Sequence, residues 1–303
     1  MANKELNMYR RINCPCCGSG KTDVVANLEY SDSFVKDSSR ELSEFLMNSR
    51  YIVRYCIGCA FYFKEFALED DEAMTVYSLY EESSGCSLKS LREYAHIAED
   101  AMLIRLLFPE KTPVVLDFAM NRGDWAAMAK AYGCDVYGSD IASFSKLKAT
   151  EKGIKFIEFE NLSENKFDFI NADQVFEHLS EPFVVLKRLV SALKNGGIIK
   201  ISTPGDKAFS KKLKYLNNKT IFSEKFVKLF DPLFPLIHIN LFSATSLKKL
   251  GIRAGLRPIR IPLRISYSTM TLFDSLRQIN RNLYNPFKRW LSSGTWQYFK
   301  KVK

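Results

Sequence analysis

The chain has 303 residues, of which 47% are hydrophobic, and a formal net charge of +10. This composition supports a sizeable folded core. The first residues are polar and charged and no run of 18 apolar residues occurs, so we expect neither a signal peptide nor a membrane-spanning helix. We therefore expect a cytoplasmic protein.

The excess positive charge lies in the C-terminal region. Residues 251–303 hold eleven Lys and Arg against one acid, Asp274, whereas residues 1–250 hold 33 basic and 33 acidic side chains. A neutral body with a basic tail is not typical of a nucleic-acid-binding protein. It favours contact between the tail and something anionic: the inner face of a membrane, a phosphorylated substrate or a partner.

Four of the seven cysteines have the spacing of a metal site. Cys14 and Cys17 form one CxxC pair and Cys56 and Cys59 form another, with 38 residues between the pairs. Together they offer the four thiolate ligands of a closed, structural Zn²⁺ site, and unrelated reduced thiols are the alternative. Cys16 is a spare thiol that competes as a ligand.

The metal pattern and the following residues divide the chain into three parts. We predict a zinc-ribbon module over residues 1–68, a helical linker over 69–108 and a larger α/β domain over 109–303. Two segments interrupt that domain. Residues 204–240, rich in aromatic residues and proline, are interpreted as a substrate lid or wall, with a surface excursion of no function as the alternative. Residues 266–292 are interpreted as a basic amphipathic insertion that packs on the sheet or lies on anionic lipid.

Residues 114–141 predict a βαβ unit. The apolar run Val114–Phe118 is typical of a buried strand, Gly123–Tyr132 has helical spacing, and Asp135–Asp140 predicts a second strand that ends in an acid. A carboxylate at that tip is placed to bond the two hydroxyls of a ribose, while backbone N–H groups at the helix start meet the polar end of a ligand.

The turn inside this unit departs from the usual glycine pattern. Glycine is expected at three alternate positions, which here hold Ala119, Asn121 and Gly123. Asparagine tolerates a left-handed conformation better than other non-glycine residues, whereas alanine adds a methyl group where a ligand should approach the backbone. Taken alone, the turn fits either a nucleotide-like ligand or an ordinary α/β connection.

The remaining elements continue the alternation of strand and helix. We predict a strand over 167–172, a helix over 181–194 that ends at the Asn195–Gly197 turn, a strand over 198–203, a helix over 245–254, a strand over 256–265 and an antiparallel last strand over 295–302.

These signals together resemble the class I S-adenosylmethionine-dependent methyltransferases that carry an N-terminal zinc ribbon. The matching pieces are VLDFAMNRGD, VYGSDI, FDFINADQVFEHLSEP, LKNGGIIKISTPG and HINLFSATSLKKL. The resemblance covers roughly residues 91 to 260. It implies a Rossmann-like fold with a seven-stranded sheet, S-adenosylmethionine as cofactor, and methyl transfer as the activity.

The resemblance also implies residue roles. Asp117 orients the turn and the amino group of the methionine part, Ala119, Asn121 and Gly123 form the turn, and Asp140 takes the ribose hydroxyls. Asn161 and Leu162 lie where the adenine edge is met, and Asp173 or Gln174 closes over the methionine part. Plain loop roles are the alternative for Asn161, Leu162 and Asp173, and a loop-capping role for Asp117.

Three histidines are available to act as a base. His178 follows the fourth predicted strand and His238 ends the predicted lid, and both match histidines of similar ribbon-bearing methyltransferases. A base with a pKa near 6.5 would suit a hydroxyl acceptor. A structural, hydrogen-bonded histidine is the alternative for each, and it is the interpretation of His96. Glu177 is interpreted as a helix-start acid or a substrate ligand.

The sequence therefore predicts a methyltransferase for a small molecule, a sugar or a glycan precursor, by O-methylation with a histidine base. Two other hypotheses stay open. The first is a scaffold that keeps the fold but has lost cofactor affinity, which Ala119 and Asn121 favour. The second is a nucleic-acid protein, which the mixed charge of the ribbon segment disfavours. The oligomeric state is not determined by the sequence.

Overall fold

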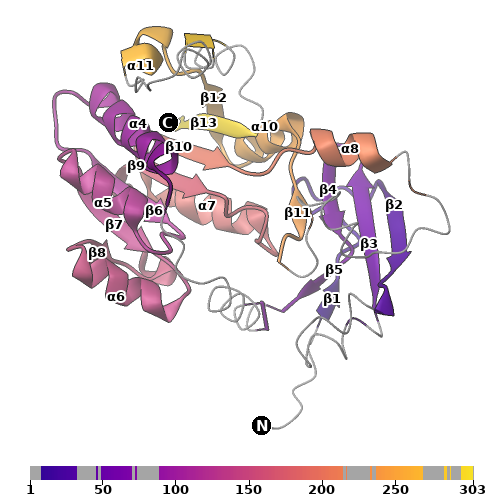
Figure 1. Cartoon of the computed structure of the whole chain (residues 1–303). Helices are drawn as coiled ribbons and strands as arrows, with labels where there is room; N and C mark the ends of the chain where they lie inside the picture. Colours follow the sequence, from indigo (N-terminus) through magenta and orange to yellow (C-terminus); the bar gives the residue numbers. More distant parts are fainter. Residues whose placement is uncertain are drawn as a thin grey trace. The chain divides into compact units, whose positions relative to one another are not determined.

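The computed structural model describes residues 8–32, 46, 49–69, 72–73, 89–213, 216, 233, 237–268, 283–284, 287 and 295–302 (Figure 1). The chain divides into two compact units. One unit, here called the N-terminal unit, comprises Met1–Ser83, Phe176–Phe183 and Thr203–Leu250. The other, the sheet unit, comprises Ser84–Val175, Val184–Ser202 and Gly251–Lys303.

The sheet unit contains a seven-stranded sheet in the order β12-β13-β10-β9-β6-β7-β8. Its strands, in chain order, are β6 (Val114–Phe118), β7 (Asp135–Ser139), β8 (Lys155–Phe156), β9 (Phe167–Asp173), β10 (Leu193–Ser202), β12 (Leu256–Ile259) and β13 (Trp296–Lys301). β13 is antiparallel to both of its neighbours, whereas β10, β9, β6, β7 and β8 run parallel. β6 is the first strand of this sheet along the chain and the central one of its five parallel strands. Its carboxyl end lies where the strand order reverses, and ligands usually bind such sheets at this position.

The helices connect the strands as α/β alternation requires. They are α4 (Leu91–Leu107), α5 (Asp124–Ala131), α6 (Ser143–Glu151), α7 (Pro182–Ala192), α8 (Lys207–Leu213), α10 (Ala244–Arg253) and α11 (Leu263–Ser268), with a 3-10 turn, η1, at Phe159–Asn161. α4 begins with a capping box between Ser90 and Glu93 and packs against α5 (Figure 1). Under α5, Trp125 stacks on Phe169 of β9 with ring centroids 6.3 Å apart. Apolar burial of this kind fixes the helix that begins at the turn after β6.

The N-terminal unit is built on a four-stranded antiparallel sheet in the order β11-β4-β3-β2. The strands are β2 (Thr22–Glu29), β3 (Arg50–Cys56), β4 (Phe61–Lys64) and β11 (Asn240–Leu241), and a separate pair joins β1 (Met8–Arg10) to β5 (Phe66–Leu68). Tyr51, Val53 and Leu241 form its core together with Phe209 of α8. β11 therefore extends a sheet whose other strands lie far earlier in the sequence.

Arg11 and Asn240 join distant segments inside this unit. The buried Arg11 guanidinium donates to the carbonyls of Lys64 and Ile239, to the carbonyl of Ser180 and to Asn240 Oδ1. Asn240 Nδ2 donates in turn to the carbonyls of Phe176 and Leu179 at 3.0 and 2.6 Å. Because buried polar groups are costly without partners, this network holds residues 176–183 to the N-terminal unit.

The predicted and the observed elements agree closely around the turn after β6. They differ at β10 and at β12. The helix predicted over 181–194 ends at Ala192, and Asn195–Gly197 lies inside β10, where the register on β9 shifts between Leu193 and Ile198. The strand predicted over 256–265 ends at Ile259. Pro262 interrupts it, and the N–H groups of Ile265 and Ser266 donate to the Pro262 carbonyl in the first turn of α11.

The predicted domain boundaries stay predictions, but one feature was not foreseen: residues 176–183 and 203–250 group with the N-terminal module. Most of the predicted lid, 204–240, and most of the basic insertion, 266–292, lie outside the described residues, as does much of the linker before α4. Among the described residues, no helix has the length and apolarity needed to cross a bilayer.

Candidate functional site

The turn that follows β6 keeps the backbone of a glycine-rich loop with only one of its glycines. Ala119, Asn121 and Gly123 have φ of 58°, 47° and 70°, so all three alternate positions lie in the left-handed region. Glycine enters that region without steric cost, whereas for another residue the conformation costs about 1–2 kcal/mol. The sequence departs from the pattern at two positions, but the turn retains its shape.

Met120 is buried beneath this turn. Its N–H donates to the Ser139 carbonyl at 3.1 Å, and its carbonyl accepts from the Gly123 N–H at 2.7 Å. A Cβ at Gly138 would overlap with Met120 Sδ, and one at Gly123 would lie 2.7 Å from Met120 Cε. The Met120 side chain therefore fills the space that two glycines leave, and the chain is left-handed on both sides of it.

Asp140, directly after β7, is bonded to the turn. Its Oδ2 accepts from the Asn121 N–H at 2.7 Å and its Oδ1 accepts from the Ala142 N–H at 2.8 Å, one residue before α6 begins. Backbone donors of this kind orient a carboxylate. The structure therefore brings together the acid and the turn that the sequence predicted as neighbours.

Asp117 is a buried acid with an unused oxygen. Its Oδ1 accepts from Asn171 Nδ2 at 2.8 Å, whereas its Oδ2 is buried and accepts no hydrogen bond from the described residues. Burial raises the pKa of Asp117 to about 7, and the Asn171 hydrogen bond opposes that rise. A buried acceptor without a partner is costly, so this site is suited to a cationic or hydrogen-bonding group of a ligand.

The other predicted cofactor positions differ in how they are presented. Leu162 is buried, at 2% exposure, and its side chain belongs to the packing. Asn161 ends η1 and is exposed. Asp173 ends β9 and accepts from the Ser202 hydroxyl, and Gln174, with a φ of 55°, donates from Nε2 to Ser202 Oγ at 3.2 Å. Asp173 and Gln174 are thus tied to the end of β10.

An aromatic pair at the same edge of the sheet was missed from the sequence. Phe118 ends β6 and Phe159 begins η1, and their ring centroids are 5.5 Å apart. Both residues are half-buried. The available signal was positional: Phe118 ends a strand and Phe159 follows shortly after another one, β8, so both lie where a ligand ring would meet an apolar wall.

The four predicted metal ligands lie together in the N-terminal unit. The Sγ atoms of Cys14 and Cys59 are 3.6 Å apart, as are those of Cys17 and Cys56, and all four lie within 4.8 Å of one another. Tetrahedral coordination at a metal–sulfur distance of about 2.3 Å places sulfurs about 3.8 Å apart.

The two cysteine loops have the same backbone form. The Gly18 N–H donates to the Cys14 carbonyl at 2.7 Å, and the Ala60 N–H donates to the Cys56 carbonyl at 2.9 Å. Both of these fifth residues are left-handed, with φ of 79° at Gly18 and 58° at Ala60. The spare thiol, Cys16, donates from its Sγ to the Ser246 carbonyl at 3.4 Å. The paired loops present four thiols, and Cys16 is not among them.

Glu177, His178 and His238 form a second cluster in the N-terminal unit, with one ligand-type atom of each within 4.8 Å of the others. The two imidazole rings meet edge to face with centroids 4.7 Å apart. His178 Nδ1 is 3.0 Å from the Ile237 carbonyl, which only accepts, so Nδ1 carries the proton and Nε2 carries the lone pair.

Burial, together with the neighbouring His238, lowers the pKa of His178 to about 4, and the hydrogen bond to the Ile237 carbonyl opposes part of the shift. The sequence predicted a pKa near 6.5 for this base, and the environment of His178 gives a lower pKa. The ring is neutral at pH 7, but it is a weaker base than an exposed histidine. His96 lies on α4 with Nδ1 3.3 Å from Glu99 Oε2, in keeping with a structural role.

The sheet reverses its strand order beside β6, a left-handed turn follows that strand, and an acid is bonded to the turn. This is the position at which open α/β sheets bind their ligands. A family model described as "Methyltransferase domain" matches residues 91–261. The chain belongs to this methyltransferase-domain family. The matched region contains the turn, Asp117, Asp140 and both histidines of the cluster.

Solved structures with a similar chain path are methyltransferases as well. The plantazolicin methyltransferase BpumL is 18% identical, with 78% of this chain and 92% of that chain covered and a TM-score of 0.46. Magnesium protoporphyrin IX methyltransferase from Synechocystis is 15% identical, with 75% and 95% covered and a TM-score of 0.45. A methyltransferase from Mesorhizobium loti is 15% identical, with 67% and 98% covered and a TM-score of 0.44. No curated protein matches the chain. At these scores the structures say nothing about the acceptor.

The strain at Ala119 is testable. Ala119→Gly removes the Cβ from a left-handed position, so we expect the free energy of unfolding to rise by about 1 kcal/mol, the relief of strain exceeding the entropic cost of glycine. The measurement is urea denaturation. Ala127→Gly, inside α5, is the matched control and should lower stability by about 1 kcal/mol. Equal losses in both variants would contradict a strained turn.

Proposed function

We propose that the chain is an S-adenosylmethionine-dependent methyltransferase and that the donor binds at the turn after β6. The observation that carries the proposal is the buried Asp117 Oδ2, which lacks a hydrogen-bond donor among the described residues at the end of the central strand. The ammonium of the methionine part supplies that donor. Asp140, oriented by two backbone amides, is suited to the ribose hydroxyls.

When bound, the donor supplies an activated methyl group on a sulfonium, with a good leaving group. The chain's own contribution is to bind, orient and exclude water. Asp117 and Asp140 would hold two ends of the donor through different kinds of bond: an ion pair at Asp117 and hydroxyl bonds at Asp140. Phe118 and Phe159 offer an apolar wall for its ring system.

The competing hypothesis is a scaffold that keeps the fold without the donor. Its sequence argument was that Ala119 and Asn121 leave less room in the turn. The observed turn keeps left-handed φ at all three alternate positions, which supports donor binding. The side chains of Ala119 and Asn121 remain the groups that a glycine-rich turn would lack. Donor binding measured on the purified chain separates the two hypotheses.

Donor affinity should depend on pH in a way that identifies Asp117. The carboxyl, with a pKa of about 7, must be ionised to pair with an ammonium, so the Kd should fall as pH rises from about 6 to about 7.5. Above about pH 8 the α-amino group itself loses its proton, and the Kd should rise again. Calorimetry with S-adenosylmethionine across this range is the measurement.

Asp117→Asn should weaken binding and flatten the limb below about pH 7. The matched control is Asp135→Asn, because Asp135 lies at the opposite end of β7 and pairs with Lys155; its curve should equal that of the native chain. Absence of any binding at saturating donor would contradict the enzyme and favour the scaffold. Binding whose Kd does not change below about pH 7 would contradict only the role of Asp117, and not the activity.

For the acceptor we propose a hydroxyl of a small molecule, sugar or glycan precursor, with His178 as the base. The support is the neutral tautomer, which leaves Nε2 unprotonated, together with the adjoining His238 and Glu177. The low pKa favours a proton transfer late in the displacement, when the hydroxyl has become acidic. His238 is proposed as a second base or a contact to the acceptor.

Turnover should test this assignment. With sugar nucleotides as acceptors, we expect His178→Asn to lower kcat by about 10²–10⁴-fold and to leave the donor Kd unchanged, measured as S-adenosylhomocysteine release and by calorimetry. His96→Asn is the control and should keep native turnover. A kcat within twofold of native in His178→Asn would remove His178 as the base.

We further propose that Cys14, Cys17, Cys56 and Cys59 hold one structural Zn²⁺, supported by the sulfur separations and the paired loops. The purified chain should contain about one zinc by mass spectrometry. Cys56→Ser should lose the metal and lower the melting temperature. Cys16→Ser is the matched control and should keep it, because Cys16 donates to a carbonyl instead. Native metal content in Cys56→Ser would refute the ligand set.

The remaining partner proposals rest on the sequence. The basic C-terminal region is proposed to contact an anionic membrane surface, and specific nucleic acid binding is not expected. Most of that region lies outside the described residues.

A further inference from the structure

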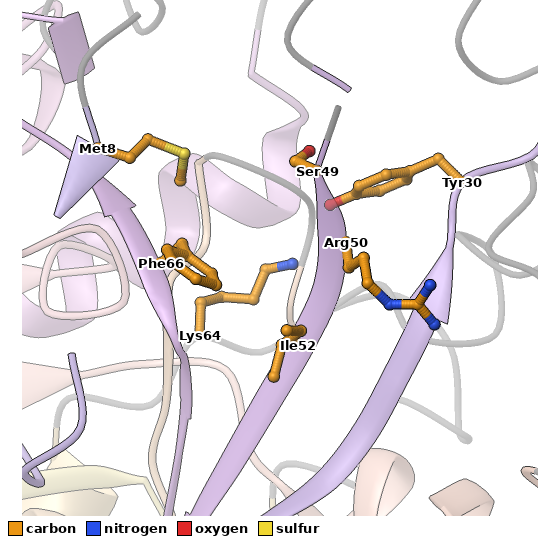
Figure 2. A pocket seen from close by; sticks show the side chains of 7 residues that line it. All are labelled: Met8, Tyr30, Ser49, Arg50, Ile52, Lys64 and Phe66. Carbon is orange, nitrogen blue, oxygen red and sulfur yellow. The ribbon is translucent and has the colours of Figure 1, made fainter. Parts of the chain in front are cut away.

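A small pocket opens beside β3 and β4 in the N-terminal unit, apart from the cysteine and histidine clusters. Figure 2 shows its walls: the apolar side chains of Met8 and Phe66, the polar groups of Tyr30, Ser49 and Arg50, and the amine of Lys64 reaching between them. Neither donor binding nor metal binding uses these side chains.

Lys64 is the unusual member of this group. It ends β4, opposite Val53 of β3, and only 5% of it is exposed. Buried lysines are almost always paired. Among the described residues, no carboxylate lies within ion-pair distance of Lys64 Nζ. Its recorded neighbour is the face of the Tyr51 ring, with Nζ 3.4 Å from the centroid.

The groups around Lys64 make it harder still for its amine to stay protonated. Burial and the nearby Arg11 both lower the pKa of Lys64. Arg11 itself is buried on carbonyl groups and Asn240, and Glu181 interacts with it electrostatically without a recorded ion-pair contact. The nearest buried acid along the chain, Glu65, is taken by Arg10 and Arg54. Lys64 therefore holds its proton less firmly than an exposed lysine, and a bound anion would favour its protonated form.

Arg50 lines the same pocket but is already compensated. Its guanidinium lies 2.5 Å from Glu29 Oε1 and 2.6 Å from Asn27 Oδ1. Lys64 is therefore the cation available to a ligand. Ser49 adds a hydroxyl to the same wall, and Tyr30 adds its phenol ring.

We propose that this pocket binds a small oxyanion, the phosphate or carboxylate group of a ligand, through Lys64. An anion restores the Coulombic balance of a buried ammonium, and a cation in a water-poor site binds an anion more strongly than one at the surface. Phe66 and Met8 provide apolar contact for the adjoining part of the ligand.

A purely structural role for Lys64 is the rival explanation. A cation–π contact of the kind made with Tyr51 is a real stabilising interaction when it is desolvated, but burying an ammonium is more costly than such a contact is favourable. The contact with Tyr51 alone therefore does not explain why this buried position holds a lysine and not an apolar residue. A ligand whose negative charge neutralises the ammonium does explain it.

The test uses the full-length protein with inorganic phosphate and, separately, acetate as probes. With lysine labelled at its ε-carbon, we expect the Lys64 NMR signal to shift and saturate with one of the two anions, and the anion that saturates it identifies the chemistry. Chloride at equal ionic strength controls for screening. An unmoved Lys64 signal with both anions would overturn the proposal.

A variant pair supplies a second measurement. Lys64→Met keeps the length and apolar stem and should weaken binding of the saturating anion at least about tenfold in calorimetry. Lys248→Met, on the exposed face of α10, is the matched control and should bind as the native protein does. Native affinity in a folded Lys64→Met variant would refute the site; if that variant does not fold, the NMR titration of the native chain decides. The outcome is independent of methyl transfer, because neither probe is a methyl acceptor.

Discussion

The inward packing of Met120 is the constraint on which the candidate donor site depends. The side chain fills the space over Gly138 and Gly123, and the residues before and after it, Ala119 and Asn121, are both left-handed. In this conformation the Asn121 N–H points at Asp140, and α5 begins directly after Gly123. The turn thus keeps the shape of a glycine-rich loop around a buried methionine, whose apolar burial helps to offset the strain of the two non-glycine residues.

The sequence could predict those parts of the fold that depend on local pattern. Runs of apolar residues located β6, β7 and β9 to within about a residue, and the acid at position 140 lies at the turn as the βαβ pattern indicated. The differences have local causes. Gly196, with a φ of 77°, lies in the irregular part of β10 instead of ending a helix, and Pro262 starts α11 where a continued strand was expected. The spacing of the cysteines was sufficient to group four sulfurs.

Features that depend on distant partners could not be predicted. Arg11 and Asn240 are separated by 229 positions, and no periodicity in the chain relates them. Their hydrogen bonds decide that residues 176–183 belong with the N-terminal sheet. The environment of His178 follows from the same packing, so the sequence could not predict its lowered pKa. From the sequence alone, a histidine after a strand is expected to have an ordinary pKa. The burial of Lys64 was equally hidden, because a lysine in an alternating run is expected to face solvent.

The two cysteine loops are alike in form but unequal in conformational energy. Gly18 occupies its left-handed position at no steric expense, whereas Ala60 carries a methyl group at a φ of 58°. The zinc proposed above would therefore have to hold the Cys56–Cys59 loop in a conformation that costs free energy, whereas the Cys14–Cys17 loop adopts the same form without that cost. Loss of such an ion would be expected to begin with the Cys56–Cys59 loop.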